Sequence, residues 1–248
     1  QAKTLFPYTT LFRSASAVAA ATVFSPAIAS AQDTGQPIRL IVPYAPGGPL
    51  DVTSRVLAER VRDQLGTVVV EQKVGAGGRI AVTTLKDAAP DGLTMLLSPS
   101  SMFTIYPHVV KRLQYQPATD AIAVSPVALS TCGFMVGPKV PESVRTLRQF
   151  ADWAKAQPEP QGYASPAAGA MPHFLGNQFA RAAGVALTHL PYRGAAPALT
   201  DLLGGQVPLF LDPPPNLIQP AKAGRITLIG VASEKRLPML PDVPTFIE

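Results

Sequence analysis

The sequence is poor in the side chains that most often carry redox, metal and covalent chemistry: its 248 residues include one cysteine and three histidines. Cys132 cannot form an internal disulfide, and its apolar neighbours predict a buried small side chain. His108, His173 and His189 show none of the spacings of a metal site. The sequence therefore predicts no metal, no disulfide framework and no cofactor.

Signatures of catalysis and of nucleic-acid binding are missing as well. There is no G-x-S-x-G nucleophile turn. The stretch VGAGGRI (74–80) departs from G-x-G-x-x-G at Ile80 and lacks the Lys-Ser/Thr of a phosphate-binding loop. The net charge of +5 is scattered, with no segment that interleaves basic and aromatic residues. Nucleic acid is therefore not expected as a partner, whereas a mildly basic surface suits an anionic small ligand.

The first 31 residues differ in character from the rest. Residues 15–31, ASAVAAATVFSPAIASA, end in an A-x-A site typical of signal-peptidase cleavage, and they are too few to span a bilayer, which takes about 20 apolar residues. Residues 1–14, QAKTLFPYTTLFRS, resemble a translated sequencing adapter and are interpreted as non-native. We interpret 15–31 as the remnant of a signal peptide and expect export, with the lack of disulfides favouring a periplasm.

From residue 37 onward, apolar runs alternate with amphipathic segments. The first block predicts strand, helix, strand, helix and strand, at 37–44, 49–66, 67–74, 78–89 and 93–98. Short loops and this order are typical of a parallel, doubly wound α/β sheet. An extended apolar stretch, 121–137, leads to a second block. Its helices are expected at 144–156, 171–183, 195–203 and 215–223, and its strands at 161–164, 186–190, 206–211 and 225–233.

The two blocks predict two α/β lobes with chain crossings near 127–134 and 229–233. Residues 32–128 and 232–248 are assigned to lobe 1 and residues 129–231 to lobe 2. The proline-rich coil at the end is interpreted as a cut end, with the C-terminal part of lobe 1 missing.

The loop VPYAPGGPLD (43–52) follows the first predicted strand. Pro49 suits the first helical position, and Asp51 lies where the helix dipole favours a negative charge. Gly47 and Gly48 allow the backbone to approach a ligand. In open α/β sheets the ligand crevice lies at the carboxyl ends of the strands, so this loop predicts half of a carboxylate site. A tight turn without a ligand is the alternative interpretation.

Two loops of the second block repeat this pattern. In GYASPAAGAMPHF (162–174), Ser165, Ala168 and Gly169 lie where backbone amides can hold an anion, and His173 either donates to the ligand or braces the loop. In the loop after the next strand, Arg193 can pair with a carboxylate through two hydrogen bonds or remain solvated.

Six ordered motifs resemble the tripartite tricarboxylate transporter receptors, also called the Bug family. They are VPYAPGGPLDVTSRVLAERV, VVVEQKVGAGGRIAV, AAPDGLTMLL, YASPAAGAMPH, LPYRGAAPALTDLLGGQV and LPDVPTFIE. The resemblance covers residues 36–248 and implies a periplasmic binding protein of a Gram-negative bacterium, with two α/β lobes that close on a ligand. Family members usually continue several tens of residues further.

The resemblance, with the loops above, implies a set of candidate ligand-binding residues and no catalytic residue. The set is Tyr44, Pro46, Gly47, Gly48, Asp51, Ser100, Met102, Phe103, Ser165, Ala168, Gly169, Ala170, His173, Arg193 and Asp212. Where the family commonly reads S-x-G-x-G-S, this chain has Ser165-Pro166-Ala167-Ala168-Gly169-Ala170, and Met102 and Phe103 replace polar residues. These departures predict a more apolar pocket, and hence a monocarboxylate or an aromatic acid in preference to citrate.

The expected function is capture of a small carboxylate by a monomeric protein that passes it to the subunits of a tripartite tricarboxylate-type membrane transporter. Two alternatives stay open. One is an exported hydrolase using Ser165 and His173, with Asp212 as a third member. The other is a ligand-sensing domain for a signalling partner.

Overall fold

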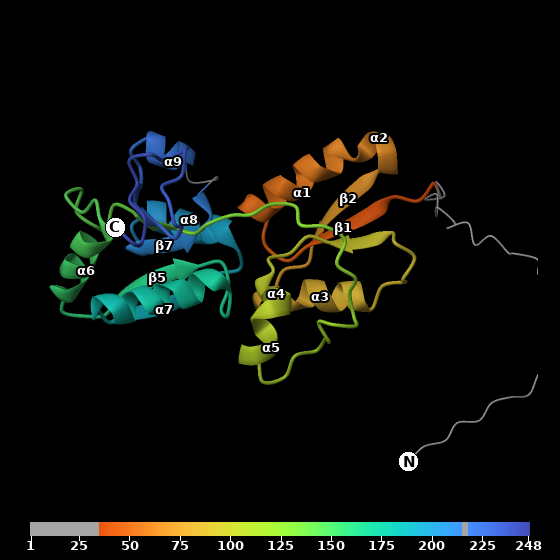
Figure 1. The fold of residues 1–248 in the computed structure, drawn as a ribbon, viewed down its shortest axis with the longest axis horizontal. Helices are drawn as coiled ribbons and strands as arrows, with labels where there is room; N and C mark the ends of the chain where they lie inside the picture. The colour runs from red at the N-terminus through yellow and green to blue at the C-terminus, as the bar shows by residue number, and fades with distance from the viewer. Residues whose placement is uncertain (1–34, 215–217) are drawn as a thin grey trace, which may run out of the picture. The chain divides into compact units, whose positions relative to one another are not determined.

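The computed structural model describes residues 35–214 and 218–248 (Figure 1). The leader expected at 1–31 and the first residues of the helix expected at 215–223 lie outside the described residues. The described strands form two sheets, one of three strands in the order β2-β1-β3 and one of five in the order β6-β5-β7-β4-β8. We call residues 35–120 the first body, residues 131–248 the second body and residues 121–130 the connector.

The first sheet is parallel throughout, as the sequence predicts. Leu40 in β1 pairs with Val70 in β2 and with Met95 in β3. Figure 1 shows α1 and α2 on one face of this sheet and α3 on the other. The element bounds are β1 (Ile38–Val42), α1 (Pro49–Arg60), α2 (Arg62–Leu65), β2 (Val68–Gln72), α3 (Arg79–Lys86), β3 (Thr94–Leu96), α4 (Ser101–Thr104) and α5 (Tyr106–Val109).

The second sheet is mixed, because β4 runs antiparallel to both of its neighbours, β7 and β8. Successive residues of β4 serve two clusters: Phe134 and Val136 pack in one, and Met135 packs in the other. This alternation shows that the sheet is buried on both faces. The bounds are β4 (Gly133–Val136), α6 (Leu147–Lys155), β5 (Gln161–Ser165), α7 (Met171–Ala183), β6 (Leu187–Pro191), α8 (Ala195–Leu203), β7 (Leu209–Asp212), α9 (Ile218–Lys222) and β8 (Thr227–Val231).

Helix α6 begins three residues after the start expected from the sequence, because Thr146 caps it. The Thr146 hydroxyl accepts from the Gln149 backbone N–H at 3.2 Å, and the Gln149 side chain accepts from the Thr146 N–H at 3.1 Å. This reciprocal arrangement satisfies amides that have no partner inside the helix.

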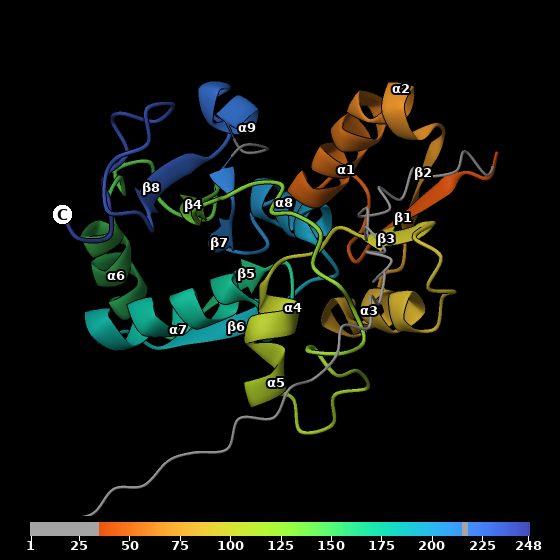
Figure 2. The same cartoon turned by 45° about the vertical axis from the view of Figure 1, so that its right-hand side comes forward.

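The extended apolar stretch expected at 121–137 divides into the connector and β4. Residues 122–130 are solvent-exposed without regular structure, and Leu129 is fully exposed. Regular pairing begins only at Gly133, in β4. Figure 2, a second view of the ribbon, shows the connector running between the two bodies.

The segment 232–248 contacts the second body, whereas the sequence analysis assigns it to lobe 1. Thr245 bridges Val231 at the end of β8. The ring of Phe246 lies 4.7 Å from that of Phe134 and 6.1 Å from that of Phe179, centroid to centroid. Aromatic burial thus holds this segment on the second sheet. The lobe boundaries of the protein stay a prediction.

Among the residues that the structure describes, no helix has both the length and the apolar character needed to cross a membrane.

Candidate functional site

The loop after β1 is braced from within by Asp51. Its carboxylate, only 5% exposed, accepts hydrogen bonds from the Gly47 N–H at 3.0 Å, from Gln72 Nε2 at 2.7 Å and from Arg55 Nε at 3.1 Å. Burial alone would raise the pKa of Asp51, but these donors hold it below its usual value. Asp51 therefore shapes the loop, with its side chain bound to donors of the first body.

This loop lies against the turn that precedes α8. The Ala45 N–H donates to the Arg193 carbonyl at 3.2 Å. A Cβ added at Gly48 would lie 3.5 Å from Cβ of Ala195, and one added at Gly194 would lie 3.1 Å from the Ala45 nitrogen. Small residues on both sides let the two backbones meet. The loop 43–52 and the loop of Arg193 (192–194), both singled out in the sequence, are therefore neighbours.

The loop after β5 is held by buried polar contacts. Ser165 is fully buried, and its hydroxyl donates to the Ala167 carbonyl at 3.1 Å. Gly169, at φ +79°, donates its N–H to Nδ1 of His173 at 3.1 Å. Ala170 caps α7 without a side-chain hydrogen bond. His173 thus braces the loop, which is one of the two roles expected for it.

His189, which the sequence analysis left out of the site, stacks on His173. The ring centroids lie 3.8 Å apart at an interplanar angle of 16°, and Nε2 of His189 lies 2.7 Å from Oγ of Ser165. Burial lowers the pKa of both rings, and His173 further lowers that of His189, to about 4. The pair is therefore neutral near pH 7. Ser165 is paired with His189, not with the His173 of the expected hydrolytic pair.

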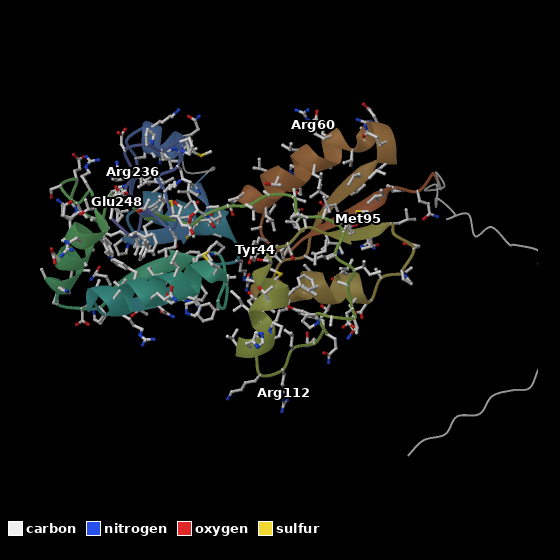
Figure 3. All side chains as sticks on the ribbon, viewed as in Figure 1. Tyr44, Arg60, Met95, Arg112, Arg236 and Glu248 are labelled. Carbon is white, nitrogen blue, oxygen red and sulfur yellow. The ribbon has the colours of Figure 1, made fainter. Side chains whose placement is uncertain are left out.

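A small cavity of about 30 Å³ lies among loops of both bodies. Its lining consists of Pro43, Tyr44, Val74, Gly75, Ala76, Gly77, Gly78, Pro166, Tyr192 and Arg193. Tyr44, labelled in Figure 3, and Arg193 are the two expected site residues in this wall. Within the described parts of the chain, Arg193 has no ion-pair partner, so the cavity wall carries one uncompensated cation.

The cavity volume is far below that of a ligand pocket, which is typically several hundred Å³. A wider depression of about 320 Å³ lies over the segment 234–248. There Arg236 and Glu248 are paired at 2.8 Å (Figure 3). Because the smaller cavity adjoins loops of both sheets, it is the better candidate site.

Asp212 ends β7 and is 2% exposed. Burial raises the pKa of Asp212 well above its usual value. Within the described residues, its Oδ2 is one of two buried side-chain oxygens without a hydrogen-bond partner. Its charge also contributes, after burial and Tyr106, to the raised pKa of Tyr44. Asp212 therefore lies close to the cavity without lining it.

The expected residues of segment 98–104 do not line the cavity. Ser100 is exposed, Met102 is fully buried in a cluster of the first body, and Phe103 packs on the Tyr115 ring at 5.9 Å. Met102 reaches the cavity only through Gly78, where an added Cβ would meet its Cε at 2.0 Å. Met102 and Phe103 therefore give this cavity no apolar wall, and the preference for an aromatic acid stays a prediction.

Comparison with known proteins decides the family. Residues 53–248 match the tripartite tricarboxylate transporter family receptor. The chain belongs to this family. Protein BugT of Bordetella pertussis is 34% identical over 215 residues, which cover 86% of this chain and 65% of BugT. The chain thus spans slightly less than two thirds of the length of that relative.

Solved structures of the receptor family agree with the fold. The periplasmic binding protein BugD is 38% identical, with a TM-score of 0.74 over 84% of this chain and 69% of BugD. Rpa4515 of R. palustris, solved with adipate, is 29% identical, with a TM-score of 0.79 over 86% of this chain and 72% of its own. The chain therefore has the α/β fold of two-lobed periplasmic binding proteins. The receptor family is a solute-binding family.

The site includes residues that the sequence analysis missed. The glycine-rich loop VGAGG, weighed only as a nucleotide motif, forms much of the cavity wall. Its residues from Gly75 through Gly78 all have positive φ angles. The glycines in the sequence are the pattern that could have predicted this backbone. Tyr192 adjoins the noted Arg193, but no local pattern pointed to His189 or Tyr106. Within 35–214 and 218–248, no cluster of His, Cys, Asp and Glu could hold a metal ion.

Proposed function

We propose that this receptor captures a small carboxylate between its two bodies, in the periplasm, and delivers it to a tripartite tricarboxylate-type membrane transporter. The observation that carries the proposal is the cavity shared by loops of both bodies, with the unpaired cation of Arg193 in its wall. A guanidinium can bind a carboxylate with two parallel hydrogen bonds.

Ligand entry in this proposal requires the bodies to separate. The cavity holds about 30 Å³, which is close to the space of one water molecule. The described contacts across it are few, among them the Ala45 N–H to Arg193 carbonyl bond at 3.2 Å. Two bodies joined by a connector and by a few hydrogen bonds suit a hinge motion that closes on a ligand.

The proposed binding surface combines Tyr44, Arg193 and the backbone of the glycine-rich loop with the loops expected from the sequence. Pro46, Gly47 and Gly48 support it from the first body, and Gly169 and Ala168 from the second. Asp212, neutral when protonated, can donate to a ligand carboxylate if the bodies rearrange. Adipate, which is bound in the Rpa4515 structure, belongs to the ligand class proposed for this chain.

The proposal includes no catalytic step and no cofactor. Ser165, the nucleophile of the hydrolytic alternative, is fully buried, and its hydroxyl donates to the Ala167 carbonyl. The protein is proposed to act as a monomer, since binding needs only its own two bodies.

Thermal unfolding with a panel of ligands tests the proposal. Adipate, citrate and benzoate are compared with hexane-1,6-diol, which has the carbon chain of adipate but no carboxylate. A ligand at a hundred times its dissociation constant should stabilise the fold by about 2.7 kcal/mol. A rise in midpoint with an acid and none with the diol is expected. No rise with any acid would contradict carboxylate binding.

Arg193→Gln should abolish most of that rise, because the cation of the cavity wall is lost. Arg148→Gln is the matched control, since Arg148 is an exposed arginine on α6, outside the cavity wall. Arg148→Gln should keep the full shift, and a full shift in Arg193→Gln would contradict the proposed recognition by Arg193. A larger shift with benzoate than with adipate would favour the aromatic-acid prediction.

A further inference from the structure

Tyr106 joins a loop of the first body to a loop of the second. It begins α5 and is 1% exposed. Its hydroxyl lies 2.7 Å from the carbonyl oxygen of Gly77 and 3.1 Å from that of Ala168. Gly77 belongs to the cavity wall of the first body, and Ala168 to the loop after β5 of the second. One side chain thus contacts both sides of the proposed ligand site without lining it.

Glycines on both sides make room for the ring. A Cβ added at Gly77, where φ is +67°, would lie 2.9 Å from the Tyr106 hydroxyl oxygen. A Cβ added at Gly169, where φ is +79°, would lie 3.1 Å from Cε1 of the ring. The phenol is therefore wedged between two backbone segments that only glycine allows to approach so closely.

A phenol has a single proton to donate, so the two carbonyls share it. Burial raises the pKa of Tyr106 to about 12, which keeps this proton in place at neutral pH. When the bodies separate, the Tyr106 hydroxyl can donate its hydrogen bond to the Gly77 carbonyl alone, which stays with Tyr106 in the first body. Ala168 is exposed, so its carbonyl can turn to water. Neither partner is left buried without a hydrogen bond.

We propose that Tyr106 is a positioning residue that latches the second body onto the first, through the proton its hydroxyl shares between the carbonyls of Gly77 and Ala168. The inference rests on the proposed function in taking opening and closing of the bodies as part of ligand capture. It adds that the ligand-free protein favours the closed arrangement of the bodies, and that the Tyr106 hydrogen bonds determine how strongly this arrangement is favoured.

Tyr115 separates this role from ordinary core packing. It belongs to the same cluster of the first body as Tyr106 and is 2% exposed. Its hydroxyl also donates to a backbone carbonyl, that of Met102, but both partners lie in the first body. Tyr115→Phe therefore removes a buried phenol hydrogen bond without touching the junction between the bodies.

The test measures the distance between the bodies in ligand-free protein. Spin labels are placed at Asp63→Cys on α2 and Asp152→Cys on α6, both exposed positions, and the native Cys132 is fully buried. Tyr106→Phe should shift the distance distribution to longer values or broaden it, whereas Tyr115→Phe should leave it unchanged. With adipate as the probe, Tyr106→Phe should weaken binding roughly three- to tenfold, mainly through faster release.

An unchanged distribution in Tyr106→Phe would overturn the latch, and so would an equal shift in Tyr115→Phe. A shift in Tyr106→Phe without any adipate binding would support the latch while the carboxylate function failed. If Tyr106→Phe unfolds, Gly169→Ala disturbs the same contact from the second body, and the same lengthening is expected.

Discussion

The strands of the two bodies differ in burial. In the second body, every residue of β4 and β7 is buried. In the first body, β3 is half-buried throughout, and Val69 at the second position of β2 is exposed. The clusters differ in the same sense. The cluster of the first body has four buried members, all in or beside helices α3 to α5. The buried members of the two clusters of the second body come from four strands and several helices.

Polar contacts are prominent in the first body. Arg39 in β1 holds Glu71 in β2 with two hydrogen bonds of 2.8 and 3.0 Å, and Asp51 gathers donors from three segments. Exposed ion pairs contribute little to stability, so we expect the first body to open more readily than the second. Binding loops commonly come from the less stable parts of a protein, which fits the glycine-rich wall of the cavity.

Removing a core ring from the second body should have the largest effect. Phe134→Ala should lower the free energy of unfolding by about 3–5 kcal/mol, because Phe134 is fully buried between Phe179 and Phe246. Native-state hydrogen exchange should show faster exchange in the first body of the wild type and near-equal exchange in this variant.

Met102→Ala is the counterpart in the first body, where it should widen the difference in exchange. Equal protection of the two bodies in the wild type would contradict the comparison.

A smaller loss is expected where α7 approaches β5. Gly176→Ala would place a Cβ 2.2 Å from the ring of Tyr163, whose hydroxyl donates to the His173 carbonyl at 2.8 Å. Overpacking of this kind costs about 1–3 kcal/mol. Gln178→Ala, at an exposed position of the same helix, is the control and should leave the denaturation midpoint unchanged. A stable Gly176→Ala protein would show that α7 can shift on the sheet.

The second body should also be the more sensitive to mild acid. The folded pKa of His189, about 4, lies below its ordinary value, so between pH 6.5 and 4 the unfolded chain binds a proton that the folded one does not. The free energy of unfolding should therefore decrease as the pH falls from 6.5 to 4, by on the order of 1 kcal/mol for a part-exposed ring. The neighbouring His173 acts in the same direction, and Asp212, whose pKa is raised, acts oppositely.

Urea unfolding at pH 7 and pH 4.5 gives the loss of stability on acidification, and comparing this loss between each variant and the wild type isolates the contribution of one side chain. His189→Gln should lose less stability on acidification than the wild type. His108→Gln, at an exposed position of the first body, should behave as the wild type does. An identical pH dependence in His189→Gln would rule out His189 as a cause.

Local patterns predicted most helices and strands well. The helices expected at 171–183 and 195–203 have those bounds in the structure, because Pro172 and Gly184 mark the ends of the first and small apolar residues fill the second. The stretch 121–137 was expected to be extended and to join the two blocks, but its apolar letters did not show that residues 122–130 are exposed and that only residues 133–136 pair as a strand.

The candidate site was predicted loop by loop but not in its internal bonding. Strand ends and glycines pointed to the loops 43–52, 162–174 and 192–194. Asp51 looked like a ligand group because the sequence does not show Gln72, 21 residues away, donating to it. Tyr106 was out of reach for the same reason: its partners are backbone carbonyls 29 and 62 residues distant. Such contacts depend on tertiary packing and leave no periodic signal.

The smallest effect is expected at the surface of the segment 232–248. Arg236 and Glu248 form hydrogen bonds of 2.8 to 3.1 Å, but both side chains are exposed, so Glu248→Gln should leave the thermal midpoint nearly unchanged. Phe246→Ala should lower it clearly, because that ring packs on Phe134. A larger loss from Glu248→Gln than from Phe246→Ala would mean that charge, not aromatic burial, holds this segment on the second sheet. The polar bracing seen in the first body would then extend to both.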